Sequence, residues 1–342
     1  MQLLRTKGLS FLSSIILIAM VVLLAHAGSQ AGTVYYTDRV AVLMYHTFNE
    51  PTDSNITVTK GQFKDHLYAL RAAGFHFITA DQFRAWKEGH AAIPPNAVLL
   101  TIDDGWPNVA TVAAPILKQY RAPSIAFVIY RRIDRSPHHM TTAQVKSLPD
   151  SGIEVQSHTW NLHHSIGGKA AAHALHPDDL REDALQARHA HARLFGTPPD
   201  MLAYPFGAYN GPFIEAARHA GIRYAFTTQP GLVSRSTPNM ELPRINAGEK
   251  GLSGHALVQR IIHFVQDSSY YIGGGFYRSR AEATQAAVRF TRLTGYRMYV
   301  TPHPSLGHGF WIQSGRANGF DWASTLAKRW SRWGIRYIIP AR

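Results

Sequence analysis

The chain has 342 residues, a formal net charge of +13 and no cysteine. At roughly 100–200 residues per domain, this length suits one large domain and a smaller one. The hydrophobic content of 45% argues against a disordered chain. Without cysteine, disulfides and thiolate metal sites are excluded, so a bound metal would need carboxylates or some of the 19 histidines. The positive charge favours anionic surroundings such as wall polymers, acidic glycans, membranes or nucleic acid, or simply serves solubility.

The N-terminus has the pattern of an export signal. Arg5 and Lys7 precede an apolar run over residues 9–25, and Ala25-His-Ala27 has the form of a signal-peptidase site. The apolar run is also long enough for an uncleaved membrane anchor. A buried core helix is the alternative, and the position at the extreme N-terminus disfavours it. Residues 1–27 are therefore predicted to be a signal peptide or an anchor. The protein is expected to be exported: extracellular, cell-wall associated or membrane-anchored.

Short β-rich runs then alternate with amphipathic stretches. The predicted strands are Val40–Tyr45, His76–Thr79, Ala97–Ile102, Ser124–Ile129, Ile153–Ser157, Met201–Tyr204 and Tyr224–Thr227. The predicted helices are Gln62–Ala73, Val112–Tyr120, Thr142–Leu148, Pro177–Phe195 and Gly211–His219. Alternation of this kind predicts a parallel sheet with crossover helices. Roughly seven such units fit an α/β fold of the (β/α) barrel type, whose active site lies at the C-terminal ends of the strands.

From about Gly251 the pattern changes. Ser253–Gln266 is predicted to be a connecting helix. Two similar units follow, and their predicted elements are Tyr270–Tyr277, Arg280–Thr294, Tyr296–Thr301, Gly309–Ser314, Asp321–Trp333 and Ile335–Ile339. The order β-α-β-β-α-β describes a small α+β domain. The predicted organisation is a barrel over 34–248, a connecting helix or linker over 249–267, and a C-terminal domain over 268–342.

The strongest chemical signal is the end of the strand at 97–102. Asp103 and Asp104 follow directly, before Gly105. Two adjacent carboxylates repel each other and are costly to bury without a counter-ion. A bound cation resolves this if one carboxylate binds the metal while the other remains free as a base. An ordinary Asp-Gly turn is the alternative.

Histidines cluster beyond the strand at 153–157. His158, His163 and His164 lie just past its end, and imidazole is the commonest side-chain metal ligand. Two histidines and one aspartate, with open positions for water and substrate, suit a catalytic metal. The spacing does not decide whether His163 or His164 binds. A surface histidine cluster is the alternative, weakened because Asp104 is expected at the same barrel face.

Two further strand ends carry polar or aromatic residues. Tyr204, Pro205, Phe206 and Gly207 form a tight turn whose aromatic faces suit one wall of a sugar groove or a packed barrel rim. His46 ends the first strand, where it could act as a general acid or be structural.

Together these segments resemble the polysaccharide deacetylase family, also called carbohydrate esterase family 4 or the NodB homology domain, over residues 40–248. The matching motifs are Thr-Ile-Asp-Asp-Gly at 101–105, Ser-His-Thr-Trp-Asn-Leu-His at 157–163 and Tyr-Pro-Phe-Gly at 204–207. The resemblance implies a distorted (β/α)7 barrel. It also implies that Asp103 is the general base, that Asp104, His158 and His163 bind the metal, and that backbone near 204–207 stabilises the oxyanion.

The Met-Tyr-His segment at 44–46 resembles the branch that includes poly-N-acetylglucosamine deacetylases. That resemblance implies that His46 is the general acid. One departure concerns Ala203, where many family members carry an arginine that pairs with the base. Arg244 is the candidate to supply this charge instead.

The C-terminal unit resembles a SPOR domain, which binds peptidoglycan glycan strands. The likeness rests on segments 270–272, 279–283 and 295–300. The expected cofactor is a divalent ion, with zinc preferred and cobalt, nickel and manganese as alternatives. The expected partners are an N-acetylated glycan, peptidoglycan through the C-terminal domain and a membrane if the anchor is retained, but not nucleic acid.

The expected reaction is hydrolysis of acetamide groups on peptidoglycan or poly-N-acetylglucosamine, with release of acetate. Chitin-type oligomers and O-acetyl esters are alternative substrates. A catalytically inactive, glycan-binding wall protein is the alternative from another class.

Overall fold

The computed structural model describes residues 33–48, 55–266, 269–302, 310–314, 317–318, 326, 329–330 and 337–340. The predicted export segment at 1–27 lies outside these residues. So does most of the predicted helix Asp321–Trp333. Within the described ranges, no helix has both the length and the apolar character needed to cross a membrane.

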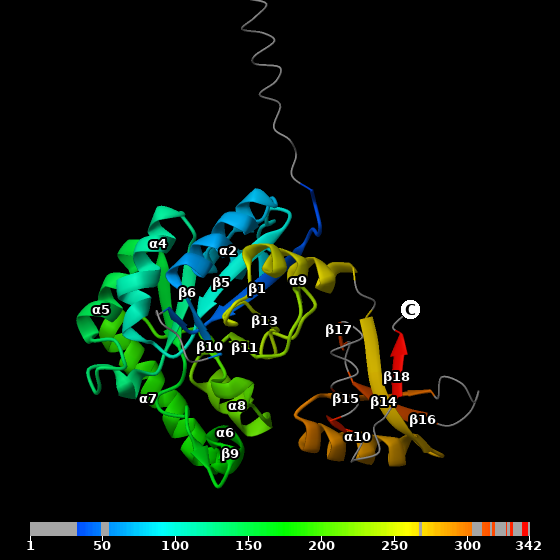
Figure 1. The fold of residues 1–342 in the computed structure, drawn as a ribbon. Helices are drawn as coiled ribbons and strands as arrows, with labels where there is room; N and C mark the ends of the chain where they lie inside the picture. The colour runs from blue at the N-terminus through cyan, green and yellow to red at the C-terminus, as the bar shows by residue number, and fades with distance from the viewer. Residues whose placement is uncertain are drawn as a thin grey trace, which may run out of the picture. The chain divides into compact units, whose positions relative to one another are not determined.

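The main sheet is parallel, as the alternating pattern predicts. Its six principal strands are β1 (Arg39–Tyr45), β5 (Ala97–Ile102), β6 (Ser124–Val128), β7 (Ile153–Ser157), β10 (Met201–Ala203) and β11 (Tyr224–Phe226). Each pairs in parallel with the next along the chain (Figure 1). The carboxyl ends of all six strands therefore lie at one edge. This is the half-barrel arrangement expected of a distorted (β/α) barrel.

A short segment, residues 242–246, takes the place of a regular closing strand, and we call it the seam. A single parallel bridge joins Phe226 at the end of β11 to Leu242. Three residues later, β13 (Ile245–Asn246) pairs in parallel with β1. The segment 242–246 thus connects the last strand of the sheet to the first. Two short strands complete the sheet: β12 (Val233–Ser234) runs antiparallel to β1, and β4 (His76–Phe77) pairs with β5.

Alternation along the strands separates two cores, because successive side chains of a strand point to opposite faces. Val40, Leu99 and Phe127 belong to an inner cluster to which β1, β5, β6, β10 and β11 all contribute. Their neighbours, such as Ala41 and Leu100, face the surrounding helices instead. This parity fixes which residues beyond a strand's end point into the barrel.

The helices cover the outer face. They are α2 (Lys60–Ala72), α4 (Ala114–Gln119) after a π-helical turn at Val109–Ala113, α5 (Thr142–Ser147), α7 (Pro177–Phe195) and α8 (Gly211–His219) (Figure 1). Helix α7 ends at Gly196, whose φ of 80° favours glycine. The remaining short elements are β2 (Thr47–Phe48), β3 (Thr57–Val58), β8 (Ser165–Ile166), β9 (Lys169–Ala170), α6 (Ala171–Ala174) and 3₁₀ turns at Tyr130–Arg132, Leu148–Ser151 and Pro205–Gly207.

Two α-helices were not predicted, the four-residue α6 and the longer α3 (Ala80–Lys87). Helix α3 begins with a capping box formed by Thr79 and Gln82. Its Phe83 and Trp86 are fully buried in the inner cluster, so α3 closes the barrel at the amino end of the strands. Its eight residues make only about two helical turns, so the apolar residues repeat too few times to reveal a helix in the sequence.

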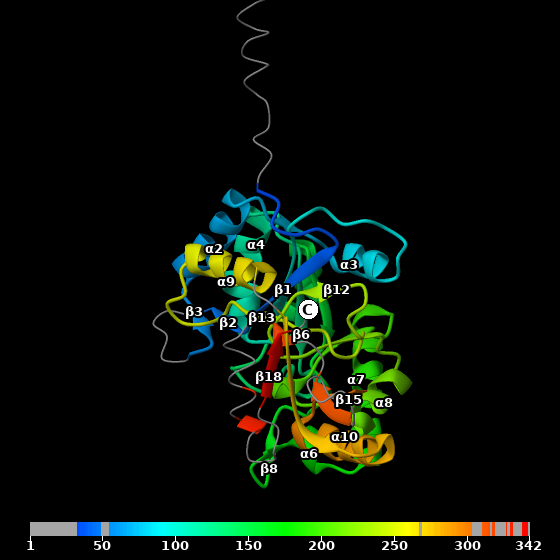
Figure 2. The same ribbon diagram turned by 90° about the vertical axis from the view of Figure 1, so that its right-hand side faces the viewer.

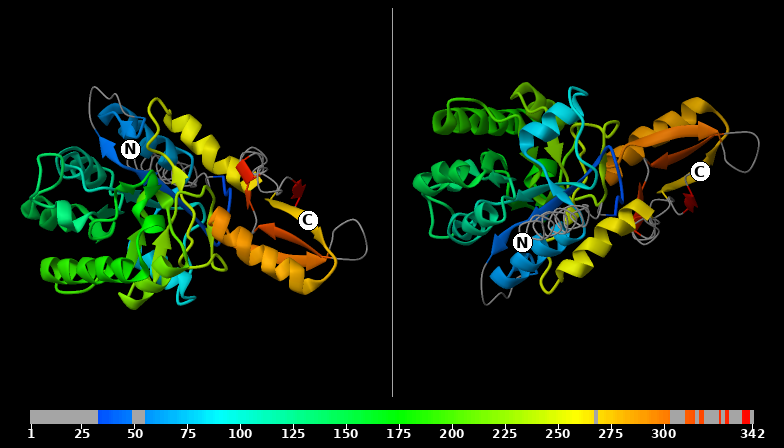
Figure 3. Two further views of the ribbon diagram at one scale, coloured as in Figure 1. Left: turned by 90° about the horizontal axis from the view of Figure 1, so that it is seen from below. Right: turned by 90° about the horizontal axis from the view of Figure 1, so that it is seen from above.

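Helix α9 (Gly254–Gln266), predicted as a connecting helix, is part of the barrel core. It lies beside α2 in two perpendicular views (Figures 2 and 3). The Gly254 N–H donates to the Asp65 carboxylate at 2.6 Å, and a Cβ at Gly254 would lie only 2.5 Å from the Asp65 carbonyl oxygen. Leu257 and Ile261 are fully buried in the outer core. Glycine therefore permits the close approach of the two helices.

The C-terminal residues form a second sheet. Its strands are β14 (Ser269–Tyr277), β15 (Met298–Pro302), β16 (Phe310–Ser314), β17 (Ala317–Asn318) and β18 (Tyr337–Pro340), all paired antiparallel. Helix α10 (Arg280–Thr294) begins with a capping box at Ser279 and Glu282 and lies along this sheet (Figure 3). Ala283, Ile312 and Trp330 form its own small core. Strands β14, β15, β16 and β18 and helix α10 follow the predicted order, while β17 was not predicted and the second predicted helix lies mostly outside the described residues. The βαββαβ domain and its SPOR-like identity therefore stay predictions.

Candidate metal centre and active site

Asp103 lies just past the end of β5, buried and paired with an arginine. Asp103 points into the barrel, as Leu99 and Thr101 do, because these residues are two and four positions apart along the strand direction. Arg244 donates to its two carboxylate oxygens at 2.8 and 2.7 Å. Burial opposes ionisation, but the Arg244 guanidinium outweighs it and holds the pKa of Asp103 below its usual value. The carboxylate is therefore an anion at neutral pH.

The seam positions Arg244. Its guanidinium donates to the Thr227 carbonyl at 2.9 Å and to the Thr101 hydroxyl at 3.1 Å, and it lies over the Phe127 ring. The side chain is fully buried, so the barrel interior fixes its orientation. The structure thus places Arg244 where the sequence suggested that a replacement for the arginine missing at Ala203 could lie.

Asp104 meets two histidines. Its Oδ1 lies 3.3 Å from Nε2 of His158 and 3.1 Å from Nε2 of His163, and the three ligand atoms lie within 4.8 Å of one another. Its Oδ2 accepts a hydrogen bond from the Trp106 indole at 3.2 Å. Asp104 has a φ of 75°, in the left-handed region that is rare for residues other than glycine. Such strain is typical of functional sites.

These three residues fit a divalent cation. Nδ1 of His158 lies 2.8 Å from the Ala203 carbonyl, which can only accept, so Nδ1 donates there and Nε2 is the ring atom turned towards Asp104. Burial lowers the pKa of His163 to about 4, so this ring is neutral at pH 7. Oδ1 of Asp104 is buried, and the only polar atoms described beside it are the two imidazole nitrogens. Two imidazole nitrogens and a carboxylate oxygen that converge in this way are typical of a metal site.

The loop that carries His163 is held by residues the sequence analysis missed. The Asp183 carboxylate accepts from the backbone N–H groups of Trp160 and Asn161 at 3.0 and 2.7 Å. The Arg132 side chain donates to the His163 carbonyl at 2.6 Å. Asp183 could have been noticed in the sequence, because it is an acid within the apolar face of helix α7.

His164 lies outside the cluster of potential ligands, which favours His163 of the two alternatives left open by the spacing. Its Nδ1 lies 2.9 Å from the Asn161 carbonyl, and the cluster contains His163 instead.

The turn after β10 places Phe206 beside the metal centre. The Phe206 ring lies 4.2 Å from the His163 ring between centroids, and 52% of the side chain is exposed. Pro205 has no N–H, while those of Tyr204 and Gly207 donate to main-chain carbonyls. The Phe206 N–H is thus the candidate oxyanion donor.

The other members of the turn have structural roles. The Tyr204 side chain is fully buried and stacks on Tyr209, so it cannot contact a glycan. Gly207 has a φ of 67°, and a Cβ there would lie 2.1 Å from Oγ1 of Thr228. Only glycine therefore fits this close approach.

His46 lies at the same edge of the sheet. Tyr45 pairs with Ile102, so His46 follows β1 at the level where Asp103 follows β5. Its Nδ1 is buried and has no partner among the described residues. Burial lowers the pKa of His46, while the Asp103 and Asp104 charges oppose that shift.

Comparisons with known proteins agree with this geometry. Residues 90–225 match the family model described as polysaccharide deacetylase. YxkH of Bacillus subtilis (strain 168) is 28% identical over 218 residues, covering 64% of this chain and 74% of YxkH. The poly-beta-1,6-N-acetyl-D-glucosamine N-deacetylase of Staphylococcus epidermidis is 28% identical over 197 residues, covering 56% of this chain and 68% of that protein.

The fold is also found among solved structures. The Streptococcus pyogenes deacetylase PplD, solved with acetate, superposes with a TM-score of 0.60 at 23% identity, covering 66% of this chain and 99% of PplD. At this identity the likeness concerns the fold alone. The family match spans Asp103, Asp104, His158 and His163, but neither His46 nor Arg244. Residues 90–225 thus resemble the polysaccharide deacetylase family, and relatives at 28% identity include a poly-beta-1,6-N-acetyl-D-glucosamine N-deacetylase, while the solved deacetylase shares the fold.

Proposed function

We propose that this protein hydrolyses the acetamide groups of an N-acetylated polysaccharide and releases acetate, using a divalent ion held by Asp104, His158 and His163. One observation carries the proposal. An ionised, arginine-paired carboxylate, Asp103, lies directly beside three potential ligand atoms that converge within 4.8 Å of one another. This combines a base and a metal site, as metal-assisted hydrolysis requires.

Each residue at the carboxyl edge of the sheet has its own role in the proposed reaction. A bound divalent ion would polarise the acetamide carbonyl and make the attacking water more acidic. Asp103 accepts the proton of that water, and Arg244 keeps its carboxylate ionised and oriented. The Phe206 N–H donates to the carbonyl oxygen as negative charge develops there. The departing sugar nitrogen takes up a proton that balances the one Asp103 removes from water, and His46 is the residue assigned to deliver it.

We assign zinc as the preferred ion. The two imidazoles and one carboxylate form the kind of set that zinc takes in catalytic sites with an open position. Cobalt, nickel and manganese have related ligand preferences.

Poly-N-acetylglucosamine and peptidoglycan are the two substrates proposed. The name of the Staphylococcus epidermidis relative supports the first. The antiparallel C-terminal sheet with α10 supports the second, if it is a SPOR-like domain that binds glycan strands. Export by the segment 1–27, with cleavage after Ala27 or retention as an anchor, would bring the protein to either polymer.

Acetate release tests the reaction. The protein beginning after Ala27 is incubated with peptidoglycan and with N-acetylglucosamine oligomers, with and without chelator. We expect release that the chelator abolishes and zinc or cobalt restores. Release that is indifferent to chelator would contradict the metal assignment. Bound metal without release from any N-acetylated glycan would contradict the deacetylase assignment.

A further inference from the structure

A second cavity lies beside the proposed centre. It has a volume of about 600 Å³ and is bounded by the loop at 130–135 and by helix α7. Four arginines line it: Arg131, Arg132, Arg135 and Arg193. At neutral pH all four carry a positive charge.

None of these four arginines forms an ion pair within the part of the chain that the structure describes, although Arg84, Arg223, Arg235, Arg244 and Arg260 do. Asp134 also lines the cavity, where Arg135 interacts with its charge and its two carboxylate oxygens accept from the Thr142 N–H and hydroxyl at 2.9 and 2.6 Å. Four guanidinium groups against one carboxylate leave the cavity with an excess of positive charge.

The cavity shares its wall with the loop that carries His163. Trp160 and Asn161 line it, and the Arg131 N–H donates to the Trp160 carbonyl at 3.0 Å. Arg132 donates to the His163 carbonyl itself. A ligand in the cavity is thus separated from the proposed centre by one short loop.

We propose that this cavity binds a carboxylate on an acidic sugar of the glycan, close to the unit being deacetylated. This inference rests on the proposed function and narrows its substrate class to acidic N-acetylated glycans. Guanidinium groups bind carboxylates through paired, charge-assisted hydrogen bonds. Deacetylation leaves an ammonium group, which the same arginines repel, so the charge favours substrate over product.

The test removes three of the charges. Arg131, Arg135 and Arg193 are changed together to Gln, and Arg132 is kept because it contacts the His163 loop. The acidic substrate is a peptidoglycan strand freed of peptides, in which alternate sugars carry a carboxylate. The same strand with its carboxylates methyl-esterified is the matched neutral substrate.

We expect KM for the acidic strand to rise about tenfold in the triple variant with kcat unchanged. KM for the esterified strand should stay constant. The control variant Arg39→Gln, Lys118→Gln, Arg181→Gln removes equal charge from exposed positions on β1, α4 and α7 and should behave as wild type. An equal rise in KM for both strands, or none for the acidic one, overturns the proposal.

Measuring the affinity for glycan strands tests this inference independently of the proposed activity. Calorimetry with the full chain carrying Asp103→Asn measures the affinity for each strand without turnover. Tighter binding of the acidic strand, lost when the three arginines are also changed, supports the cavity even if no acetate is released from any substrate. Equal affinity for the acidic and esterified strands refutes it.

Discussion

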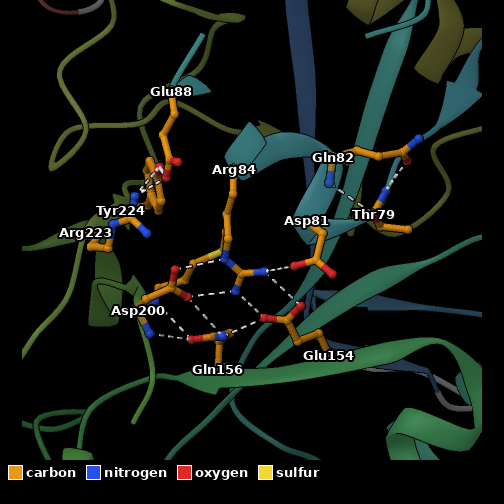
Figure 4. Close-up of polar contacts among 11 residues, drawn as sticks. Thr79, Asp81, Gln82, Arg84, Glu88, Glu154, Gln156, Asp200, Arg223 and Tyr224 are labelled. Atoms are coloured by element: carbon orange, nitrogen blue, oxygen red, sulfur yellow. Dashed lines mark hydrogen bonds and ion pairs between the residues drawn. The ribbon is translucent and has the colours of Figure 1, made fainter. Parts of the chain in front are cut away.

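The inner face of β7 carries a charged cluster at each end, and the two clusters differ in how completely their polar groups are hydrogen-bonded. Glu154, Gln156 and His158 share this face because they are two residues apart. At the amino end, Arg84 of α3 donates to Glu154, to Asp81 at 2.8 Å and to both Asp200 oxygens at 2.8 and 2.7 Å (Figure 4). Every one of these charges has a partner.

At the carboxyl end, two buried polar atoms make no hydrogen bond within the described part of the chain, although one of them lies close to two imidazoles. Oδ1 of Asp104 and Nδ1 of His46 are buried without hydrogen bonds among the described residues. Buried polar groups are normally satisfied, so unsatisfied ones need an explanation. The same strand therefore supports stability at one end and chemistry at the other, and the degree of pairing distinguishes them.

The largest expected effect is at the metal end. His158→Ala removes one of three ligands, so we expect loss of bound metal and a fall in acetate release of about 10³-fold or more. Metal content and turnover of the purified protein measure this. Arg84→Met, at the other end of the sheet, is the matched control and should retain both metal and activity. A His158→Ala protein that keeps its metal would contradict the assignment of the carboxyl end of the sheet as the metal site.

Asp103→Asn should separate the base from the ligands. The amide cannot accept a proton, so turnover is expected to fall by about 10²–10⁴-fold. Metal content should stay at the wild-type level because Asp103 is not in the ligand cluster. Full activity in Asp103→Asn would exclude this residue as the base.

A third effect concerns pH and Asp183. Burial raises the pKa of Asp183 from 3.8 to about 6, although the Asn161 and Trp160 N–H groups oppose the shift. Between these values the folded state holds a proton that the unfolded state releases. The contribution of Asp183 to stability is therefore greatest below pH 4 and is lost as pH rises through 6, by about 3 kcal/mol in total.

Denaturant titration of the metal-free protein between pH 4 and 7 measures this slope. Asp183→Asn cannot titrate, so the corresponding part of the slope should disappear. An unchanged slope in the variant would assign the pH dependence to other groups.

The smallest effect is at the amino end. Arg84→Met leaves Glu154 and Asp200 without their shared partner in a site that is about one-quarter to one-third exposed. We expect a loss of about 2 kcal/mol, reduced from a fully buried pair by solvent. Asp81→Asn is the control, since its carboxylate is 90% exposed and should matter little. Equal losses from both variants would mean that the burial of this network has no consequence.

The sequence was most informative where the pattern is local. Strands at 97–102 and 153–157 and helices at 177–195 and 211–219 have the predicted bounds. Asp104, His158 and His163 come together because each lies just past a parallel strand, which strand order alone predicts.

What the sequence could not specify depends on distant segments. The contact of Arg132 with the His163 carbonyl joins residues from two loops, and no periodicity encodes it. The pairing of Arg244 with Asp103 joins residues 141 positions apart, so the sequence alone could only nominate Arg244. Helix α9 was predicted as a connector because its packing against α2 depends on the close approach of Gly254 to Asp65, which no local pattern encodes.

The seam at 242–246 has a consequence for synthesis. The ribosome makes the proposed ligands at 104, 158 and 163 before it reaches Arg244, the partner of the base, in the segment that joins β11 to β1. A chain truncated before Leu242 has all three ligands but leaves Asp103 without its guanidinium. The partner of the proposed base is therefore translated after all three proposed ligands, and a chain of that length lacks one part of the proposed catalytic set.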